Sequence, residues 1–290
     1  MYAQITPSVL ATEAIMTLAA FDGVVIFVEG PTDMTIFEDF LPQERFRIIH
    51  SVNKDIALAA LGVIDGFDNI DQQKKRRILA LVDADFDRPM DAEFRDQAFL
   101  TDHHDLETMM LWSPAFDRWL RQYAIPTKLA QFGGPDAVRT KLLEIGGFLG
   151  AMRLFAKRRA IALDFEKIRY DTYVDKRTLE VNRQGLCQGM HGANRVVLDR
   201  LTVAELQAGV ETELQGYVGD RRDLVQGHDL INIIGLMMRF SLASMASSAC
   251  GEECIAPALR LAYRPEDWLV SNMGRTFQEY LLRSGLPPVR

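Results

Sequence analysis

The feature that most constrains the fold is a run of five apolar residues that occurs twice in the first third of the chain. Residues 24–28 (VVIFV) and 78–82 (ILALV) contain no polar side chain. Such runs predict strands that are buried on both faces, as in parallel sheets covered by helices on each side. Residues 46–50 (FRIIH) predict a further strand between them, and residues 98–100 a short fourth.

Segments with helical patterns separate these predicted strands. Gly30 and Pro31 end the first strand, and a helix is expected from Thr32 to about residue 40. Another helix is expected at residues 55–64, and one at residues 8–21 with Ser8 as its N-cap. The alternation of strands and helices predicts an α/β fold with a parallel sheet and right-handed crossovers.

Acidic residues directly follow two of the predicted strands. Glu29 follows residues 24–28 and Asp83 follows residues 78–82, with Asp33 and Asp85 shortly after them. Ligands of parallel sheets bind beyond the carboxyl ends of the strands. Because Mg²⁺ prefers oxygen ligands, we expect Glu29, Asp33, Asp83 and Asp85 to bind Mg²⁺ or Mn²⁺. Taken singly, such acids also cap helices and line turns.

A third polar segment, residues 101–107 (TDHHDLE), precedes another expected helix. Glu107 is a candidate metal ligand or general acid–base, although a carboxylate at a helix start also complements the helix dipole. His104 is a candidate phosphate contact because imidazole titrates near neutral pH.

From about residue 113 the pattern becomes mostly helical. The expected helices lie at residues 136–163 (one helix, or two with a break at Gly146–Gly147), 202–217, 229–245 and 266–283. We therefore predict a catalytic domain at residues 1–112 and a helical region at residues 113–290 that binds substrate or a partner.

The charge distribution differs between these two parts. Residues 1–110 carry 9 lysines and arginines against 20 aspartates and glutamates, whereas residues 111–290 carry 24 against 20. A basic surface near an acidic metal site suits a polyanionic substrate. Lys157, Arg158 and Arg159 are candidate phosphate contacts, and so is Lys54 after the second strand; a solvated basic helix face would show the same pattern.

The acidic motifs together resemble those of the Toprim superfamily, which topoisomerases, primases and the overcoming-lysogenization-defect nucleases share. The matching residues are Glu29, Gly30, Asp33, Asp83 and Asp85. In their order and spacing, these segments with residues 101–107 resemble a bacterial Toprim-related family that includes an effector of anti-phage defence. The resemblance implies a magnesium-dependent nuclease with Glu29, Asp83 and Asp85 in the active site, to which we add the candidate Glu107. It also implies transfer RNA or DNA as substrate and an ABC-type ATPase partner encoded alongside.

Two other functions fit the same motifs. A catalytically inactive Toprim module would bind nucleic acid or a partner without cleaving it. A metal-dependent nucleotide transferase also uses an Asp-x-Asp pair after a strand. A calcium loop of the EF-hand type is excluded, because positions six and twelve counted from Asp83 hold Arg88 and Phe94 instead of Gly and Glu.

The remaining features concern localisation and assembly. No apolar run approaches the roughly 20 residues of a membrane-spanning helix. The three cysteines form no disulfide framework, and the first twelve residues lack the features of an export signal. We therefore expect a cytoplasmic protein without a membrane partner. We also consider a homodimer, because the apolar residues of the C-terminal helices could exceed what one core can bury.

Overall fold

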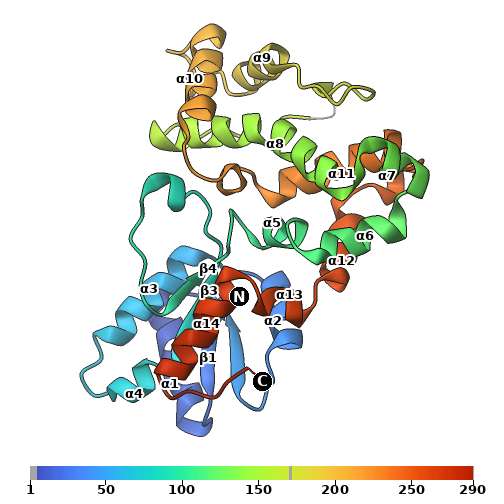
Figure 1. Cartoon of the computed structure of the whole chain (residues 1–290). Coiled ribbons are helices and arrows are strands. Elements are labelled where there is room, and N and C mark those ends of the chain that lie inside the picture. Colours follow the sequence, from blue (N-terminus) through green and yellow to red (C-terminus); the bar gives the residue numbers. More distant parts are fainter. Residues whose placement is uncertain (1–4, 170–171, 290) are drawn as a thin grey trace. The chain divides into compact units, whose positions relative to one another are not determined.

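The computed structural model describes residues 5–169 and 172–289 and has an α/β fold (Figure 1). Its four strands form a sheet that is parallel throughout, in the order β2-β1-β3-β4. The strands are β1 (Val24–Val28), β2 (Phe46–His50), β3 (Ile78–Val82) and β4 (Ala98–Leu100). The predicted fold class is confirmed, and every strand has its predicted bounds.

Two helices cover one face of this sheet. They are α1 (Pro7–Ala20) and α3 (Lys54–Asp65), and Leu10, Ala14 and Leu61 of these helices pack on Val25 and Phe27 of β1 in one buried cluster. Two further helices in this part are α2 (Pro31–Phe40) and the short α4 (Gln72–Lys75).

The N-cap predicted for the first helix is wrong by two residues. Thr6, not Ser8, caps α1, because its hydroxyl oxygen accepts a hydrogen bond from the Val9 N–H at 3.3 Å. Pro7 then occupies the first helical position, where its fixed φ suits a helix and its missing N–H costs nothing.

The C-terminal segment returns to the sheet. It forms α13 (Pro265–Leu269) and α14 (Asn272–Arg283), and the Phe277 ring packs against Phe46 of β2 and Phe99 of β4 with centroid separations of 6.2 and 5.2 Å. The single helix predicted at residues 266–283 is therefore wrong. It breaks at Ser271, whose hydroxyl oxygen caps α14 by accepting from the Gly274 N–H at 3.0 Å.

Packing divides the chain into two compact units that alternate along the sequence. The first comprises residues up to Ala84, Ala92–Asp102 and the segment from Arg264 onward; the second comprises Asp85–Asp91 and His103–Tyr263. The first unit contains the sheet. The division of the chain into domains at residue 112 stays a prediction.

The second unit is helical. Its helices are η1 (Arg88–Met90), α5 (Leu106–Leu111), α6 (Pro114–Tyr123), α7 (Pro126–Phe132), α8 (Gly134–Arg158), α9 (Arg183–Ala193), α10 (Val203–Gly216), η3 (Arg221–Asp223), α11 (Gly227–Phe240), η4 (Ser247–Ala249) and α12 (Glu252–Ala262). The helix α8 runs unbroken through Gly146 and Gly147. A Cβ at Gly146 would lie only 2.7 Å from the Leu230 side chain, so this glycine permits close helix packing and not a break. Across the described ranges, no helix has the length and apolarity needed to cross a membrane.

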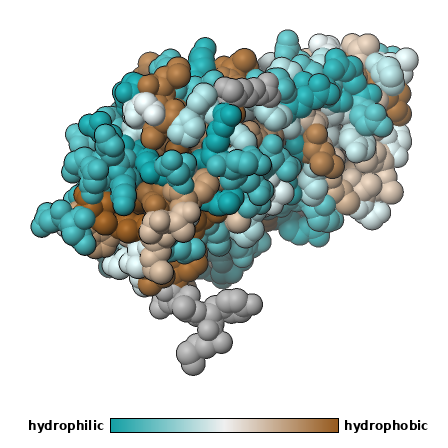
Figure 2. Space-filling view, turned by 90° about the horizontal axis from the view of Figure 1, so that it is seen from below, coloured by the Kyte–Doolittle hydropathy of each residue, from teal (hydrophilic) through white to brown (hydrophobic). Residues whose placement is uncertain are grey.

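Exposed apolar residues are scattered over the surface. The face in Figure 2 shows brown apolar residues between teal polar ones. Met16 of α1 and Leu261 of α12 are among the most exposed, at 68% and 88%. Single exposed apolar residues are common on protein surfaces, so the homodimer stays a prediction.

The core shared by α8, α9 and α10 contains a cysteine whose reactivity is predictable. Burial, reinforced by the negative charge of Glu211, raises the pKa of the Cys187 thiol from 9.0 to about 11. This higher pKa lowers the thiolate fraction of Cys187 near pH 8 about 100-fold. We expect iodoacetamide at pH 8 to alkylate the exposed Cys254 while the folded protein protects Cys187. Peptide mass spectrometry measures both, and equal labelling of the two thiols in the folded protein would contradict this packing.

Candidate metal site at the carboxyl edge of the sheet

The sheet topology places a switch point between β1 and β3. From β1 the chain passes through α2 to β2 on one side, whereas from β3 it continues to β4 on the other side. In open parallel sheets, ligands bind beyond the carboxyl ends of the two strands at such a point, because the connections diverge there and leave a crevice. The residues that follow β1 and β3 are Glu29 and Asp83.

These two acidic residues are in direct contact. The Oε1 atom of Glu29 accepts a hydrogen bond from the backbone N–H of Asp83 at 2.8 Å. The bond fixes the Glu29 carboxylate beside the end of β3 while its side chain stays partly exposed. Carboxylate oxygens from two adjacent strand ends are the donor type that Mg²⁺ prefers, so the chemistry of this edge fits such an ion.

A polar residue immediately follows each of the four strands at this edge: Glu29, Ser51, Asp83 and Thr101. Sequence reasoning missed Ser51, and it included Thr101 in the third polar segment without giving it a role. The buried Ser51 hydroxyl donates to the Val28 carbonyl at 2.8 Å, and the Thr101 hydroxyl oxygen accepts from the Ala84 N–H at 2.8 Å. Their position directly after a predicted strand was the signal that could have identified them.

Lys54, predicted as a phosphate contact, stabilises the same edge. Its Nζ donates to the carbonyl oxygens of Asp83 and Ala84 at 3.0 and 3.4 Å, and only 9% of the residue is exposed. Since the ammonium group lies against the backbone that follows β3, it holds the turn that carries Asp83. Burial of this kind favours a positioning role over direct contact with a polymer.

Two acids of the predicted motifs act as helix caps in the first unit. The Oδ2 atom of Asp33 accepts from the Gly30 N–H at 2.9 Å at the start of α2. Asp102 accepts from the N–H groups of Asn272 and Met273 at 2.9 and 2.7 Å at the start of α14. These bonds match the structural role that single acids of this kind often have.

Asp85 and Glu107 belong to the second unit. Asp85 has a left-handed backbone, with φ of 48°, and its N–H donates to the His104 carbonyl at 2.7 Å. Aspartate adopts this conformation more readily than most residues. The Glu107 carboxylate lies 3.7 Å from the Arg260 guanidinium.

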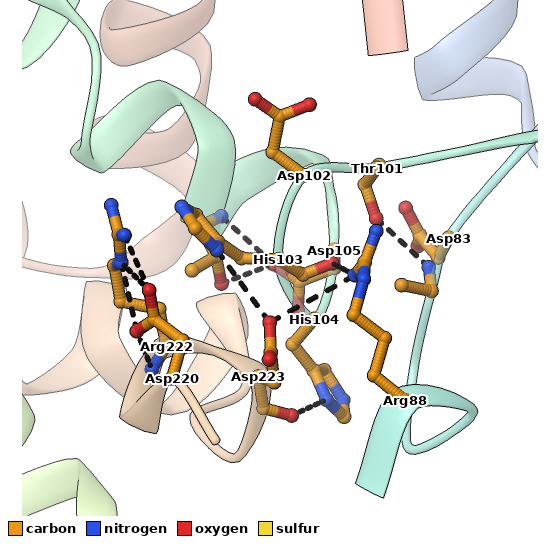
Figure 3. Close-up of polar contacts among 12 residues, drawn as sticks. Asp83, Arg88, Thr101, Asp102, His103, His104, Asp105, Asp220, Arg222 and Asp223 are labelled. Atoms are coloured by element: carbon orange, nitrogen blue, oxygen red, sulfur yellow. Dashed lines mark hydrogen bonds and ion pairs between the residues drawn. The ribbon is translucent and has the colours of Figure 1, made fainter. Parts of the chain in front are cut away.

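Buried polar contacts surround the two histidines (Figure 3). The Asp223 carboxylate lies 3.6 Å from Nδ1 of His103 and 3.8 Å from Arg88, and it accepts from the Tyr217 hydroxyl at 3.2 Å. Burial, with the nearby Asp223 charge, raises the pKa of Tyr217.

Only 1% of His104 is exposed, and its ring packs edge-on against Phe86. Because the His104 ring is enclosed by other side chains of the protein, a phosphate from solvent has no access to it. The phosphate contact predicted for His104 therefore has no support in this structure.

The predicted basic contacts lie at the end of α8. Lys157, Arg158 and Arg159 are exposed. Arg158 and Arg159 both pair with Glu213 of α10, so part of their charge is balanced within the protein.

No group of three histidine, cysteine, aspartate or glutamate side chains with metal-binding geometry occurs within the described ranges, 5–169 and 172–289. The metal site stays a prediction; of its expected ligands, the structure joins Glu29 to the backbone of Asp83. Comparisons of the sequence with protein-family models and with curated proteins gave no match.

Proposed function

We propose that this protein is a magnesium-dependent hydrolase of nucleic-acid phosphodiester bonds. The observation that carries the proposal is the Glu29 carboxylate, held by the Asp83 backbone at the switch point of a parallel sheet. A carboxylate in this position is partly exposed and has a defined orientation, as a general base requires.

The roles follow from the chemistry of hydrolysis. Glu29 would accept the proton of the attacking water, whose oxygen bonds to phosphorus as the bond to the leaving oxygen breaks and that oxygen takes up a proton from solvent. Asp83, with Asp85 two residues later in the chain, would supply oxygen ligands for Mg²⁺ or Mn²⁺. Such an ion, when bound, stabilises the negative charge that develops on the phosphate.

The substrate class rests on charge. Residues 111–290 carry more lysines and arginines than aspartates and glutamates, which suits a polyanion. The two proposed substrates are an RNA, such as transfer RNA, and DNA. The resemblance to anti-phage effectors supports a toxic activity that an ABC-type ATPase partner controls.

A binding module without catalysis is the second candidate. It is favoured by the carboxylates of Glu29 and Asp33, which both accept backbone hydrogen bonds as purely structural acids do. Metal binding separates the two candidates, since a hydrolase of this type needs the ion and a binding module does not.

Metal binding is expected to depend on Asp83. Calorimetric titration of the whole chain should show one Mg²⁺ or Mn²⁺ bound, and Asp83→Asn should weaken that binding at least about tenfold because a charged oxygen ligand is lost. The control is Asp39→Asn, an exposed acid of α2. EDTA should abolish cleavage of labelled RNA or DNA. Cleavage that persists in EDTA, or the absence of any metal-binding heat, would overturn the proposal.

A further inference from the structure

The second unit contains a cavity of about 1010 Å³ that the proposed hydrolase site does not use. It is lined by parts of α8, α11, residues 163–169 and the segment that precedes α12. Small-molecule sites typically have volumes of about 300 to 1,000 Å³, so the cavity has room for a ligand the size of a nucleotide.

One wall of the cavity holds an arginine in a fixed orientation. The Arg153 guanidinium binds the buried Asp229 carboxylate through two nitrogens, Nη2 at 3.0 Å and Nε at 3.2 Å. It also stacks 3.8 Å from the centre of the Phe165 ring. An arginine oriented by a carboxylate and an aromatic ring loses little conformational entropy when a ligand binds, and its planar donors suit phosphate.

His228 forms a second polar element of the lining. Its Nδ1 lies 2.7 Å from the Glu252 carboxylate, and its Nε2 lies 3.3 Å from the side-chain nitrogen of Asn232, which also lines the cavity. Glu252 therefore favours a proton on Nδ1 and orients the ring. The side chain is 56% exposed, so a ligand in the cavity can reach it.

Two more arginines and an apolar surface complete the lining. Arg239 donates to the Ser247 hydroxyl at 3.0 Å, and Arg169 also lines the cavity. The apolar side chains of the lining are Leu163, Phe165, Ile168 and Leu236. The cavity thus combines phosphate donors with an apolar wall against which a base can pack.

The charges of the lining favour an anion. Asp229 offsets Arg153, and Asp164 forms an ion pair with Lys167 at 2.8 Å. Over the whole lining, Arg153, Arg169 and Arg239 outnumber Asp164 and Glu166.

We infer that this cavity binds a nucleotide, with its phosphate at the arginines and its base against the apolar wall. The nucleotide can be free or can belong to a nucleic-acid strand, and both sources offer the same chemistry. Nucleotide binding in this cavity does not depend on Glu29 or on a metal ion. A failure of this inference is therefore distinguishable from a failure of the proposed hydrolase activity.

The test is calorimetric titration of the whole chain in EDTA with AMP, ATP and a six-nucleotide oligoadenylate. We expect a Kd below about 1 mM for at least one of these probes. Arg239→Gln should weaken binding about tenfold, because it removes a charged donor to phosphate. Arg121→Gln, an exposed arginine of α6 outside the cavity, is the matched control and should bind like the parent, and so should Glu29→Gln.

Tight binding of AMP or ATP would identify a free nucleotide, and binding of the oligonucleotide alone would identify a strand; both support the inference. It is overturned if none of the probes binds, or if Arg239→Gln binds as tightly as Arg121→Gln. Circular dichroism of each variant establishes that a loss of affinity does not come from unfolding.

Discussion

Replacing Glu29 by glutamine is expected to slow magnesium-dependent cleavage on the order of a thousandfold, while the protein stays folded. Glutamine keeps the side-chain oxygen that accepts the Asp83 N–H, so the contact that orients residue 29 is retained. What it loses is the negative charge and the basicity that metal binding and proton transfer require. Initial rates with labelled transfer RNA and duplex DNA in Mg²⁺ measure the effect on both proposed substrates.

The matched control for this experiment is Glu13→Gln. Glu13 lies in the same unit on α1, is exposed, and receives the same change of charge. It should leave the cleavage rate unchanged, and both variants should melt within a few degrees of the parent. A Glu29→Gln protein that cleaves as fast as the Glu13→Gln protein would remove Glu29 from the mechanism.

The largest effect on stability is expected from Asp229→Ala. The Asp229 side chain is 2% exposed and binds Arg153, whose side chain is 17% exposed. Removal of one partner of a buried ion pair leaves the other charge desolvated without compensation, which typically costs about 3 to 5 kcal/mol. For a unit of this size the melting temperature should fall by roughly 6 to 20 °C. Thermal denaturation followed by circular dichroism measures this shift.

Asp136→Ala provides the comparison for the ion pair. Asp136 also pairs with an arginine, Arg139, at 2.9 Å, but its side chain is 95% exposed. Because solvent already screens this pair, the melting temperature should change by no more than about 2 °C. Equal changes in melting temperature for the two variants would contradict the burial of the Arg153–Asp229 pair seen in the structure.

Local patterns were sufficient to predict the sheet. The runs at residues 24–28 and 78–82 are apolar at every position, and their short length favours a strand covered on both faces over a helix. The adjacent glycine, proline and polar residues then determine where each strand ends. Helix bounds were less accurate, as the Thr6 cap of α1 shows, because neighbouring polar residues can each serve as a cap.

The candidate site was predictable in part. Glu29 and Asp83 follow buried strands in the sequence, and parallel strands bring their carboxyl ends to one edge. The switch point arises because β1 pairs directly with β3. This pairing joins residues far apart in the chain, so the local sequence pattern could not predict it.

By itself, then, the sequence determined the four strands, their parallel arrangement and the two acids at their ends, because these depend on residues close together in the chain. Only the tertiary structure decided that Phe277 of the C-terminal helix packs on the sheet, that His104 is buried and that Arg153 binds Asp229. Each of these depends on residues far apart in sequence. Their local patterns fit several partners equally well, and side-chain packing selects one of them.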